Sequence, residues 1–340
     1  MNLLLVGNHF SEKKYNLNAW QDFATHMRAA GNTVITTSNK ENKVLRMIDM
    51  LVTIWNRRKE YQVAQVDVFS GQAFIWSYLS TKLLAALRKP IILTMHGGNL
   101  PEYSSRHSSS VKWLLNAADA VTAPSPYLFS KMSQYRKDIT LIPNAIDIDL
   151  YPFIQRKTVE PSLIWLRAFH QIYNPEMAIK VVDIIKKSMP EVRLLMIGPD
   201  KGDKSFQRVQ RLVSRLNLEN QVCFPGKCLK SEVPYWLNQG DIFINTTNFD
   251  NTPVSVLEAL ACGLCVVSTN VGGIPHLLKD GENALLVPPD DVSKMAEAVL
   301  RILNENGLAH KLSNNARSYA ENCDWKIVIQ KWQKLFNEIQ

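Results

Sequence analysis

The sequence predicts an α/β protein built from two doubly wound domains in tandem, and three observations support this prediction. With 340 residues, the chain is long for a single hydrophobic core. Strand and helix signals alternate along it, and each strand signal is a nearly continuous apolar run that ends in Gly, Ser, Asn or His, which is typical of parallel sheets covered on both faces. The alternation stops once, over Asp147–Ser162, and then restarts.

The first half of the chain is expected to form one sheet. Its strand signals are Asn2–Gly7, Thr33–Thr37, Val66–Gly71, Ile91–Gly97, Ala120–Ser125 and Ile139–Asn144. Helical periodicity runs from Leu17 to Ala30, where Gly31 stops it. The irregular stretch Asp147–Ser162 contains two prolines and predicts a linker. We therefore expect domains at residues 1–150 and 151–320.

The second half repeats the pattern. Its strand signals are Ser162–Arg167, Val192–Gly198, Val222–Gly226, Asp241–Thr247, Leu264–Thr269 and Asn283–Pro289. Its helix signals are Pro175–Lys187, Lys204–Leu216, Val254–Cys262 and Val292–Asn304. The segment 321–340 is expected to hold an amphipathic helix, Trp325–Ile339, that can cross back to the first domain. Ligands of such sheets bind beyond the carboxyl ends of the strands, so two facing domains predict an interdomain cleft.

Composition and charge narrow the class of protein. The net charge of +8 favours anionic partners, and no motif for nucleic acid recognition is found. The five cysteines are scattered, and the pair Cys262–Cys265 has no second pair beside it, which argues against a disulfide framework, a redox centre or a zinc site. The N-terminus has no charged region before its short apolar run, and no run reaches about 18 residues. We expect a cytoplasmic protein.

The stretch Phe249–Gly263 predicts an anion-binding helix with an unusual acid inside it. Thr252 suits the N-cap, Pro253 the first helical position and Gly263 the stop. The amide groups of the first turn, those of Val254, Ser255 and Val256, would then be available to a phosphate.

Glu258 comes three and four residues after Ser255 and Val254, so it lies on the same face of this helix as they do, about 6 Å further along the helix axis. A carboxylate there would repel a phosphate bound beside it, but it could accept two hydrogen bonds from a diol. A phosphate at the helix start and a diol one turn along describe a nucleotide. The alternative is a solvated Glu on an amphipathic helix.

This stretch resembles the signature of retaining nucleotide-sugar glycosyltransferases of family 4 (group 1), which have the GT-B fold of two Rossmann-like domains. The signature is a Glu, seven residues, and a second Glu that opens E-A-x-A-x-G; here Asp250 takes the first acidic position and Glu258 the second. The resemblance implies that Glu258 binds the ribose, the Thr252–Ser255 turn binds the diphosphate, and Asp250 contacts the donor sugar. The family has Glu where this chain has Asp250. A turn or capping acid is the alternative for Asp250.

The resemblance also assigns Arg167, after the strand Ser162–Arg167, as the cation that offsets the leaving diphosphate. The family usually adds a Lys about five residues later, where this chain has Ile172 and Tyr173, and His170 is the candidate for a partial substitute. A surface Arg in a βα loop is the alternative for Arg167.

Three further positions are expected to contact ligand. The resemblance places His96 near the reacting sugar and Gly198 near the base, and a satisfied structural histidine is the alternative for His96. The family often has a Gly-Gly loop after the first strand, whereas here only Gly7 is a glycine in Gly7–Trp20, and Lys13, Lys14 and Asn16 could supply polar contacts instead.

The segment Lys43–Tyr61 joins an apolar stripe to Arg57, Arg58 and Lys59, which is typical of helices that lie on anionic membranes; a core-packed helix is the alternative.

The function expected is a cytoplasmic, metal-independent, retaining hexosyltransferase without a cofactor, acting on a glycan or lipid-linked acceptor of a bacterial surface polysaccharide. The Asp-x-Asp at Asp147–Asp149 is discounted as a metal site because it lies in the interdomain element. An epimerase or hydrolase of nucleotide-sugars, or a non-catalytic binding partner, stays open. The sugar, base, acceptor and linkage are not identified by the sequence.

Overall fold

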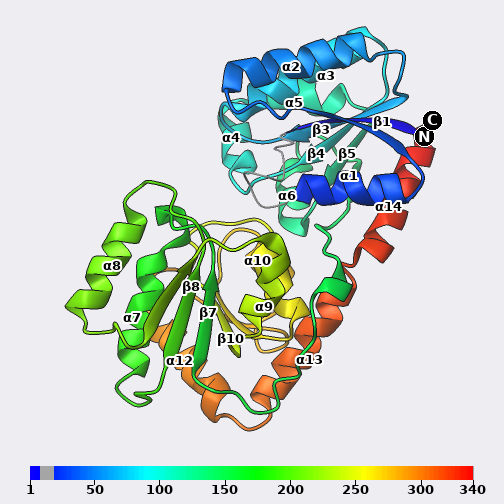
Figure 1. The fold of residues 1–340 in the computed structure, drawn as a ribbon. Helices are drawn as coiled ribbons and strands as arrows, with labels where there is room; N and C mark the ends of the chain where they lie inside the picture. The colour runs from blue at the N-terminus through cyan, green and yellow to red at the C-terminus, as the bar shows by residue number, and fades with distance from the viewer. Residues whose placement is uncertain (8–18, 340) are drawn as a thin grey trace. The chain divides into compact units, whose positions relative to one another are not determined.

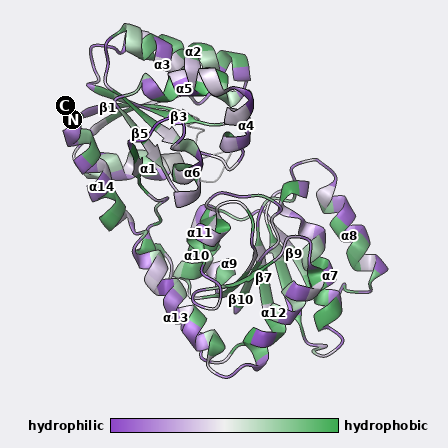
Figure 2. Ribbon diagram, turned by 180° about the vertical axis from the view of Figure 1, so that it is seen from behind, coloured by the Kyte–Doolittle hydropathy of each residue, from purple (hydrophilic) through white to green (hydrophobic). Residues whose placement is uncertain are grey.

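The computed structural model describes residues 1–7 and 19–339, which fold as two compact units. The first unit consists of Met1–Ala145 and Trp325–Gln340, and the second of Ile146–Asp324. Each unit is one parallel sheet with helices packed on it (Figure 1). In Figure 2 the strands are mainly hydrophobic, whereas the helices alternate between hydrophobic and hydrophilic residues, as expected for elements that bury one face.

The first sheet has six parallel strands in the order β2-β1-β3-β4-β5-β6. Their bounds are Asn2–Val6 (β1), Thr33–Thr37 (β2), Val63–Val68 (β3), Ile91–Met95 (β4), Ala120–Ala123 (β5) and Ile139–Leu141 (β6). The strand order reverses between β1 and β3, which makes their carboxyl ends the place where such a sheet binds ligands.

The expected bounds of β3 were wrong, since it begins at Val63 and not at Val66. Two polar residues, Gln65 and Asp67, interrupt its apolar pattern, and yet both are buried. They tolerate burial because the Gln65 amide donates to Asp67 Oδ1 (2.8 Å) and to Thr94 Oγ1 (2.8 Å) on the next strand.

Helices cover both faces of the first sheet. Their bounds are Ala19–Ala29 (α1), Lys43–Asn56 (α2), Ala73–Ala86 (α3), Leu100–Arg106 (α4), Ser108–Asn116 (α5), Pro126–Met132 (α6) and Trp325–Glu338 (α14). The last helix, α14, packs on α1, where the rings of Trp332 and Phe23 lie 4.8 Å apart in one buried cluster. Every helix in residues 1–7 and 19–339 is too short or too polar to span a bilayer.

The second sheet has the order β12-β11-β10-β7-β8-β9, again with parallel strands throughout. The bounds are Ser162–Leu166 (β7), Arg193–Ile197 (β8), Val222–Gly226 (β9), Ile242–Asn245 (β10), Cys265–Thr269 (β11) and Leu285–Val287 (β12). Its order reverses between β7 and β10, so the carboxyl ends of these two strands flank the expected ligand site.

The helices of the second unit include three that were not among the expected helix signals. Their bounds are Pro175–Ile185 (α7), Ser205–Arg215 (α8), Val233–Leu237 (α9), Val254–Ala261 (α10), Ile274–Leu277 (α11), Val292–Asn304 (α12) and Leu308–Glu321 (α13), with 3₁₀ turns at Ile148–Leu150 (η1), Gln171–Tyr173 (η2) and Lys230–Glu232 (η3). The missed helices are α9, α11 and α13, although in α13 the residues Leu308, Leu312 and Ala316 recur every four positions and are buried.

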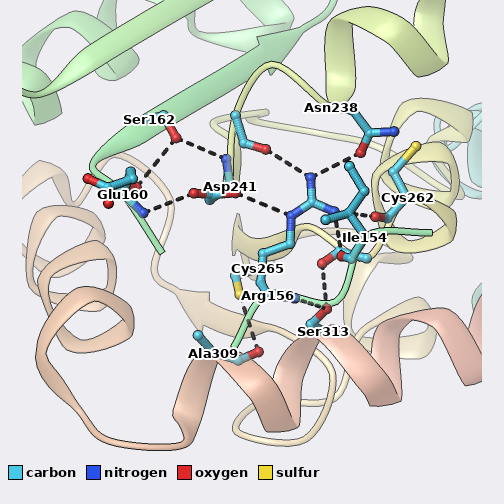
Figure 3. A network of polar contacts seen from close by, with 12 residues as sticks. Ile154, Arg156, Glu160, Ser162, Asn238, Asp241, Cys262, Cys265, Ala309 and Ser313 are labelled. Carbon is cyan, nitrogen blue, oxygen red and sulfur yellow. Dashed lines mark hydrogen bonds and ion pairs between the residues drawn. The ribbon is translucent and has the colours of Figure 1, made fainter. Parts of the chain in front are cut away.

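The stretch expected as a linker is irregular after η1, but a buried arginine fixes it to the second unit (Figure 3). The guanidinium of Arg156 donates to the carbonyl oxygens of Ile154, Gly240 and Cys262 and to side-chain oxygens of Asn238 and Asp241. Burial lowers the pKa of Arg156, and Asp241 opposes that shift. Because its guanidinium makes all these hydrogen bonds, Arg156 stabilises a single conformation of the stretch Asp147–Ser162. That conformation places Tyr151 beside α10.

Candidate active site

Arg167 directly follows β7, and Asp250 follows β10, so the two residues flank the point where the strand order of the second sheet reverses. Their side chains form an ion pair and are only 12% and 17% exposed. The backbone N–H of Arg167 donates to Ile197 O at 3.0 Å, which continues the pairing with β8 beyond the strand end. The alternative of a surface arginine is therefore wrong for Arg167.

The environment of Arg167 is that of a desolvated cation. Its guanidinium carbon lies 4.2 Å from the centre of the Tyr173 ring, and its Nη1 donates to Ser255 Oγ at 3.5 Å. Burial lowers the pKa of Arg167, while Tyr173 and Glu258 oppose that shift. An arginine stays charged at any pH of interest, so this site holds a positive charge with little water around it.

Gly198 supports Arg167 through the backbone. A Cβ on Gly198 would lie 1.9 Å from the carbonyl oxygen of Arg167, and its φ of +149° is one that other residues rarely adopt. Its N–H donates to Gly226 O at 2.9 Å. The residue lets the ends of β7 and β8 come close together, and its contact with a base stays a prediction.

Helix α10 begins at Val254, and its N-cap lies one residue later than expected. Its N-cap is Pro253 and not Thr252, because the Pro253 carbonyl already accepts the first helical hydrogen bonds, from Val256 (3.1 Å) and Leu257 (3.3 Å). The amide of Val256 is therefore not available to a ligand, contrary to expectation. The amides of Val254 and Ser255 make no hydrogen bond within the described part of the chain. Two amides, and not three, point out of this helix start.

Glu258 lies one turn inside α10 and is 4% exposed, so the alternative of a solvated residue is wrong. Its Oε1 accepts a hydrogen bond from the Tyr151 hydroxyl at 2.8 Å and pairs with the Lys230 ammonium. Neither Tyr151 nor Lys230 was predicted from the sequence. They lie 107 and 28 residues away along the chain, and no local motif links them to Glu258.

The loop that carries Asp250 is supported by the double glycine of Thr269–Pro275. The N–H of Gly273 donates to Asp250 O at 2.9 Å. A Cβ on Gly272 or Gly273 would lie 2.1 Å from the carbonyl oxygen of Asp250 or Asn251. Asp250 also accepts from the N–H of Asn251 through Oδ1 at 2.8 Å, so it orders its own turn as well as pairing with Arg167.

His170 does not take the place of the Lys that the family carries. Its Nδ1 accepts from the N–H of Ile172 (3.2 Å), and its Nε2 lies 3.9 Å from Asp203 Oδ2. Within the part of the chain that the structure describes, no contact joins it to Arg167. The cation that pairs with Glu258 of α10 is Lys230, which begins η3.

Gly7 and His96, in the first unit, both lie beside the buried carboxylate of Asp67. A Cβ on Gly7 would lie 2.2 Å from Asp67 Oδ2, and His96 Nε2 lies 3.7 Å from Asp67 Oδ1. His96 stacks on Phe69 with ring centres 5.0 Å apart. Burial raises the pKa of Asp67, and His96 and Gln65 oppose that shift. The expected contacts of Lys13, Lys14 and Asn16 lie outside the described residues.

The described ranges support neither a metal site nor a reactive cysteine pair at Cys262 and Cys265. No group of three or more His, Cys, Asp or Glu side chains there has the arrangement of a metal site. Cys262 and Cys265 are buried, and burial raises the pKa of each thiol to about 12, which makes both poor nucleophiles.

Comparison with protein families gives two adjoining matches. Residues 151–319 match the model of glycosyl transferases group 1, and residues 17–150 match that of glycosyltransferase family 4. The boundary between the two matches lies close to the boundary between the two units.

Similar proteins agree with these matches. N-acetyl-alpha-D-glucosaminyl L-malate synthase of Bacillus anthracis is 25% identical over 282 residues, which are 78% of this chain and 72% of that protein. Sucrose-phosphate synthase from Thermosynechococcus elongatus superposes with a TM-score of 0.81 at 18% identity, covering 99% of this chain and 98% of that one. Anabaena HepE, solved with UDP-glucose, superposes with a TM-score of 0.76 at 17% identity, covering 99% and 100%.

Proposed function

This chain belongs to the group 1 and family 4 glycosyltransferases, which have the GT-B fold, and we propose that it moves a hexosyl group from a nucleoside-diphosphate sugar to a hydroxyl acceptor with retention of configuration. One observation carries the proposal. Arg167 and Asp250 pair at the strand-order reversal of the second sheet, beside the start of α10 and one turn from the buried Glu258.

Charge stabilisation at the leaving diphosphate is the role proposed for Arg167 and α10. The guanidinium of Arg167 lies within 3.5 Å of Ser255 Oγ, in the first turn of that helix. The amides of Val254 and Ser255 and the helix dipole favour negative charge at the same place. Such groups act most strongly when they are already oriented in a site with little water.

Binding of a diphosphate would compete with Asp250 for Arg167. The two side chains neutralise each other as the structure has them. When the diphosphate pairs with Arg167, the Asp250 carboxylate becomes available to accept hydrogen bonds from hydroxyl groups of the donor sugar. In this exchange Asp250 pairs first with Arg167 and then with the donor sugar. We propose that Asp250 can do both although its side chain is shorter than the Glu of the family signature.

We propose that no metal ion or cofactor takes part, because Arg167 and the first turn of α10 already supply positive charge for the diphosphate. The acceptor we propose is a glycan or lipid-linked precursor of a bacterial surface polysaccharide. The relative from Bacillus anthracis carries the name of an enzyme that glycosylates a small hydroxy acid, so the acceptor class has to be tested directly.

The face of α2 supports a second proposal, that the protein contacts an anionic membrane from the cytoplasmic side. Five apolar residues on one stripe of α2 are 48–60% exposed: Val44, Leu45, Ile48, Val52 and Trp55. Arg57, Arg58 and Lys59 follow directly, and Arg58 lies over the Trp55 ring at 4.5 Å. An apolar stripe next to cations suits the boundary between acyl chains and acidic headgroups.

Vesicle sedimentation tests the membrane proposal. We expect binding to vesicles with one-third phosphatidylglycerol, weaker binding at high salt, and little binding to pure phosphatidylcholine. Ile48→Asp on α2 should abolish binding, whereas Ile327→Asp, which changes an isoleucine on α14 that is 42% exposed, should leave it unchanged. Equal binding of both variants would refute the proposal.

Turnover with a panel of nucleotide-sugars tests the main proposal. UDP-, ADP- and GDP-linked hexoses are each incubated with and without a panel of hydroxyl acceptors, and released nucleotide is measured. Release that requires an acceptor supports transfer, and NMR of the product then gives its anomeric configuration. Release without any acceptor would indicate a hydrolase and contradict the proposal.

A further inference from the structure

The Glu258 carboxylate is held through one of its two oxygens. Both of its side-chain partners contact Oε1: the Tyr151 hydroxyl donates to it at 2.8 Å, and the Lys230 ammonium pairs with it. Neither contact uses Oε2. A carboxylate held at one oxygen keeps a defined orientation, and its other oxygen can accept hydrogen bonds from a neighbouring group.

Tyr151 is well placed to orient Glu258 because its own position is fixed from several sides. The residue is 3% exposed and lies in the hydrophobic cluster that contains α10. Its N–H donates to Ile148 O at 3.1 Å, and its carbonyl accepts from Arg317 Nη1 at 3.0 Å. Arg156, five residues on, ties the same stretch to the second unit.

Lys230 approaches the same oxygen from a different element, the turn η3. Its side chain is 24% exposed, and its ammonium lies 6.0 Å from the centre of the Tyr151 ring. The turn itself is ordered by Glu232, whose Oε2 accepts from the N–H of Leu229 at 2.7 Å. Tyr151, Lys230 and Glu258 therefore form one compact cluster from three separate segments.

We infer that Tyr151 and Lys230 are positioning residues that orient Glu258 so that Oε2 accepts hydrogen bonds from the ribose of the nucleotide. The inference rests on the proposed function, because it assumes that Glu258 binds ribose. Without Tyr151 or Lys230, the carboxylate could turn about its last side-chain bond, and the geometry needed to bind two adjacent hydroxyls would be lost. The pair thereby sets how strongly the site prefers ribo- over 2′-deoxyribonucleotides.

The test measures that preference directly. The probes are UDP, ADP and GDP, each with its 2′-deoxy counterpart, and calorimetry gives both dissociation constants. The quantity compared between proteins is the ratio of the Kd of the deoxy form to that of the ribo form. For the unchanged chain we expect a ratio of at least about 10 with one of the bases, because a hydrogen bond to a charged group is lost.

Two variants, each with a matched control, separate positioning from general stability. Tyr151→Phe and Lys230→Met should lower the ratio to below about 3 while changing the Kd of the deoxy form by less than about threefold, because only the ribose contact is affected. Tyr319→Phe removes the hydroxyl of a half-buried tyrosine on α13, and Lys279→Met removes an exposed ammonium; both should keep the ratio of the unchanged chain.

The outcomes are distinguishable. If the unchanged chain binds none of the probes, the proposed function itself fails. If it binds and discriminates, but folded Tyr151→Phe and Lys230→Met keep the full ratio, nucleotide binding stands and the positioning role is wrong. Should Tyr151→Phe not fold, Lys230→Met decides alone, since Lys230 is partly exposed and its loss leaves the hydrophobic cluster intact.

Discussion

Arg167 and Asp250, which lie 83 residues apart in the sequence, form an ion pair across the strand-order reversal of the second sheet. Because both are mostly buried, the pair is a feature of the site itself and not of the surface. Replacing one partner leaves the other charge in a site with little water.

Arg167→Ala should lower kcat/KM of transfer by about 100-fold or more, because a preoriented charge at the leaving group is removed. Arg167→Lys should recover only part of this, since an ammonium lacks the planar guanidinium that lies over the Tyr173 ring. Initial rates with a saturating acceptor measure the effect. Arg301→Ala, an exposed arginine paired with Glu305, is the control and should keep full activity. Full activity of Arg167→Ala would exclude its role at the diphosphate.

Glu258→Gln should weaken nucleotide binding by about tenfold or more, because one hydrogen bond to a charged acceptor is lost at the ribose. The Gln form is chosen because it fills the same volume, whereas Glu258→Ala also leaves a cavity beneath Tyr151 and Lys230. Calorimetry with UDP, ADP and GDP measures the change, and a circular dichroism spectrum checks that the fold is intact. Unchanged affinity in a folded variant would refute the ribose contact.

Gly272→Ala should reduce activity much more than Gly281→Ala. Both residues have a positive φ, +55° and +68°, so each substitution carries a similar backbone cost of roughly 1–2 kcal/mol. Only at Gly272 would the new Cβ lie 2.1 Å from the Asp250 carbonyl oxygen, whereas nothing lies within 4 Å of it at Gly281. The loop that carries Asp250 would have to move. Equal losses of activity in the two variants would show that the contact with Asp250 is unimportant.

The sequence predicted the repeating architecture well because parallel strands buried on both faces leave a strong local pattern. Helix α12 was expected at Val292–Asn304 and has those bounds. Where the pattern failed, tertiary contacts explain the difference: β3 tolerates two polar residues because they pair with each other and with β4. Among the missed helices, α13 is short of strong apolar side chains and depends on packing against α10.

For the site, the sequence indicated the residues that belong to one motif and missed those that reach it from elsewhere. Asp250 and Glu258 are eight residues apart, so their spacing is visible along the chain. Tyr151 and Lys230 contact Glu258 only because of the path that Arg156 imposes on the linker and because η3 follows β9. No one-dimensional pattern contains that information. The N-cap of α10 lies one residue later than expected because the carbonyl of Pro253 accepts the first helical hydrogen bonds.

The free energy of unfolding of Asp67→Asn should increase relative to that of the unchanged chain as the pH rises from 4 towards neutrality. Burial raises the pKa of Asp67 in the folded protein above its ordinary value of 3.8, which the unfolded chain keeps. At pH values between the unfolded and the folded pKa, the folded protein therefore binds more protons than the unfolded chain. The free energy of unfolding therefore falls as the pH rises through that window. Asparagine cannot ionise, so the variant does not share this loss.

Chemical denaturation at several pH values measures the difference in unfolding free energy between the variant and the unchanged chain. Asp138→Asn is a control of opposite sign, because its hydrogen bond from Arg136 lowers the pKa of Asp138, and the stability that this group contributes is lost as the pH falls. The contribution of the neighbouring His96 side chain, 3.7 Å from Asp67, is separated by repeating the series in His96→Gln. A difference for Asp67→Asn that is independent of pH would show that the carboxylate is ionised equally in both states.

Transfer should continue at an unchanged rate in excess EDTA. The expectation follows from Arg167 and from the amides of Val254 and Ser255, which together place positive charge where a diphosphate would leave. The decisive comparison adds Mg²⁺ to Arg167→Ala. If the arginine supplies the charge, the ion should restore part of the activity of that variant and none to the unchanged chain. Abolished transfer of the unchanged chain in EDTA, restored by Mg²⁺, would show that Arg167 does not suffice and that an ion assists the leaving group.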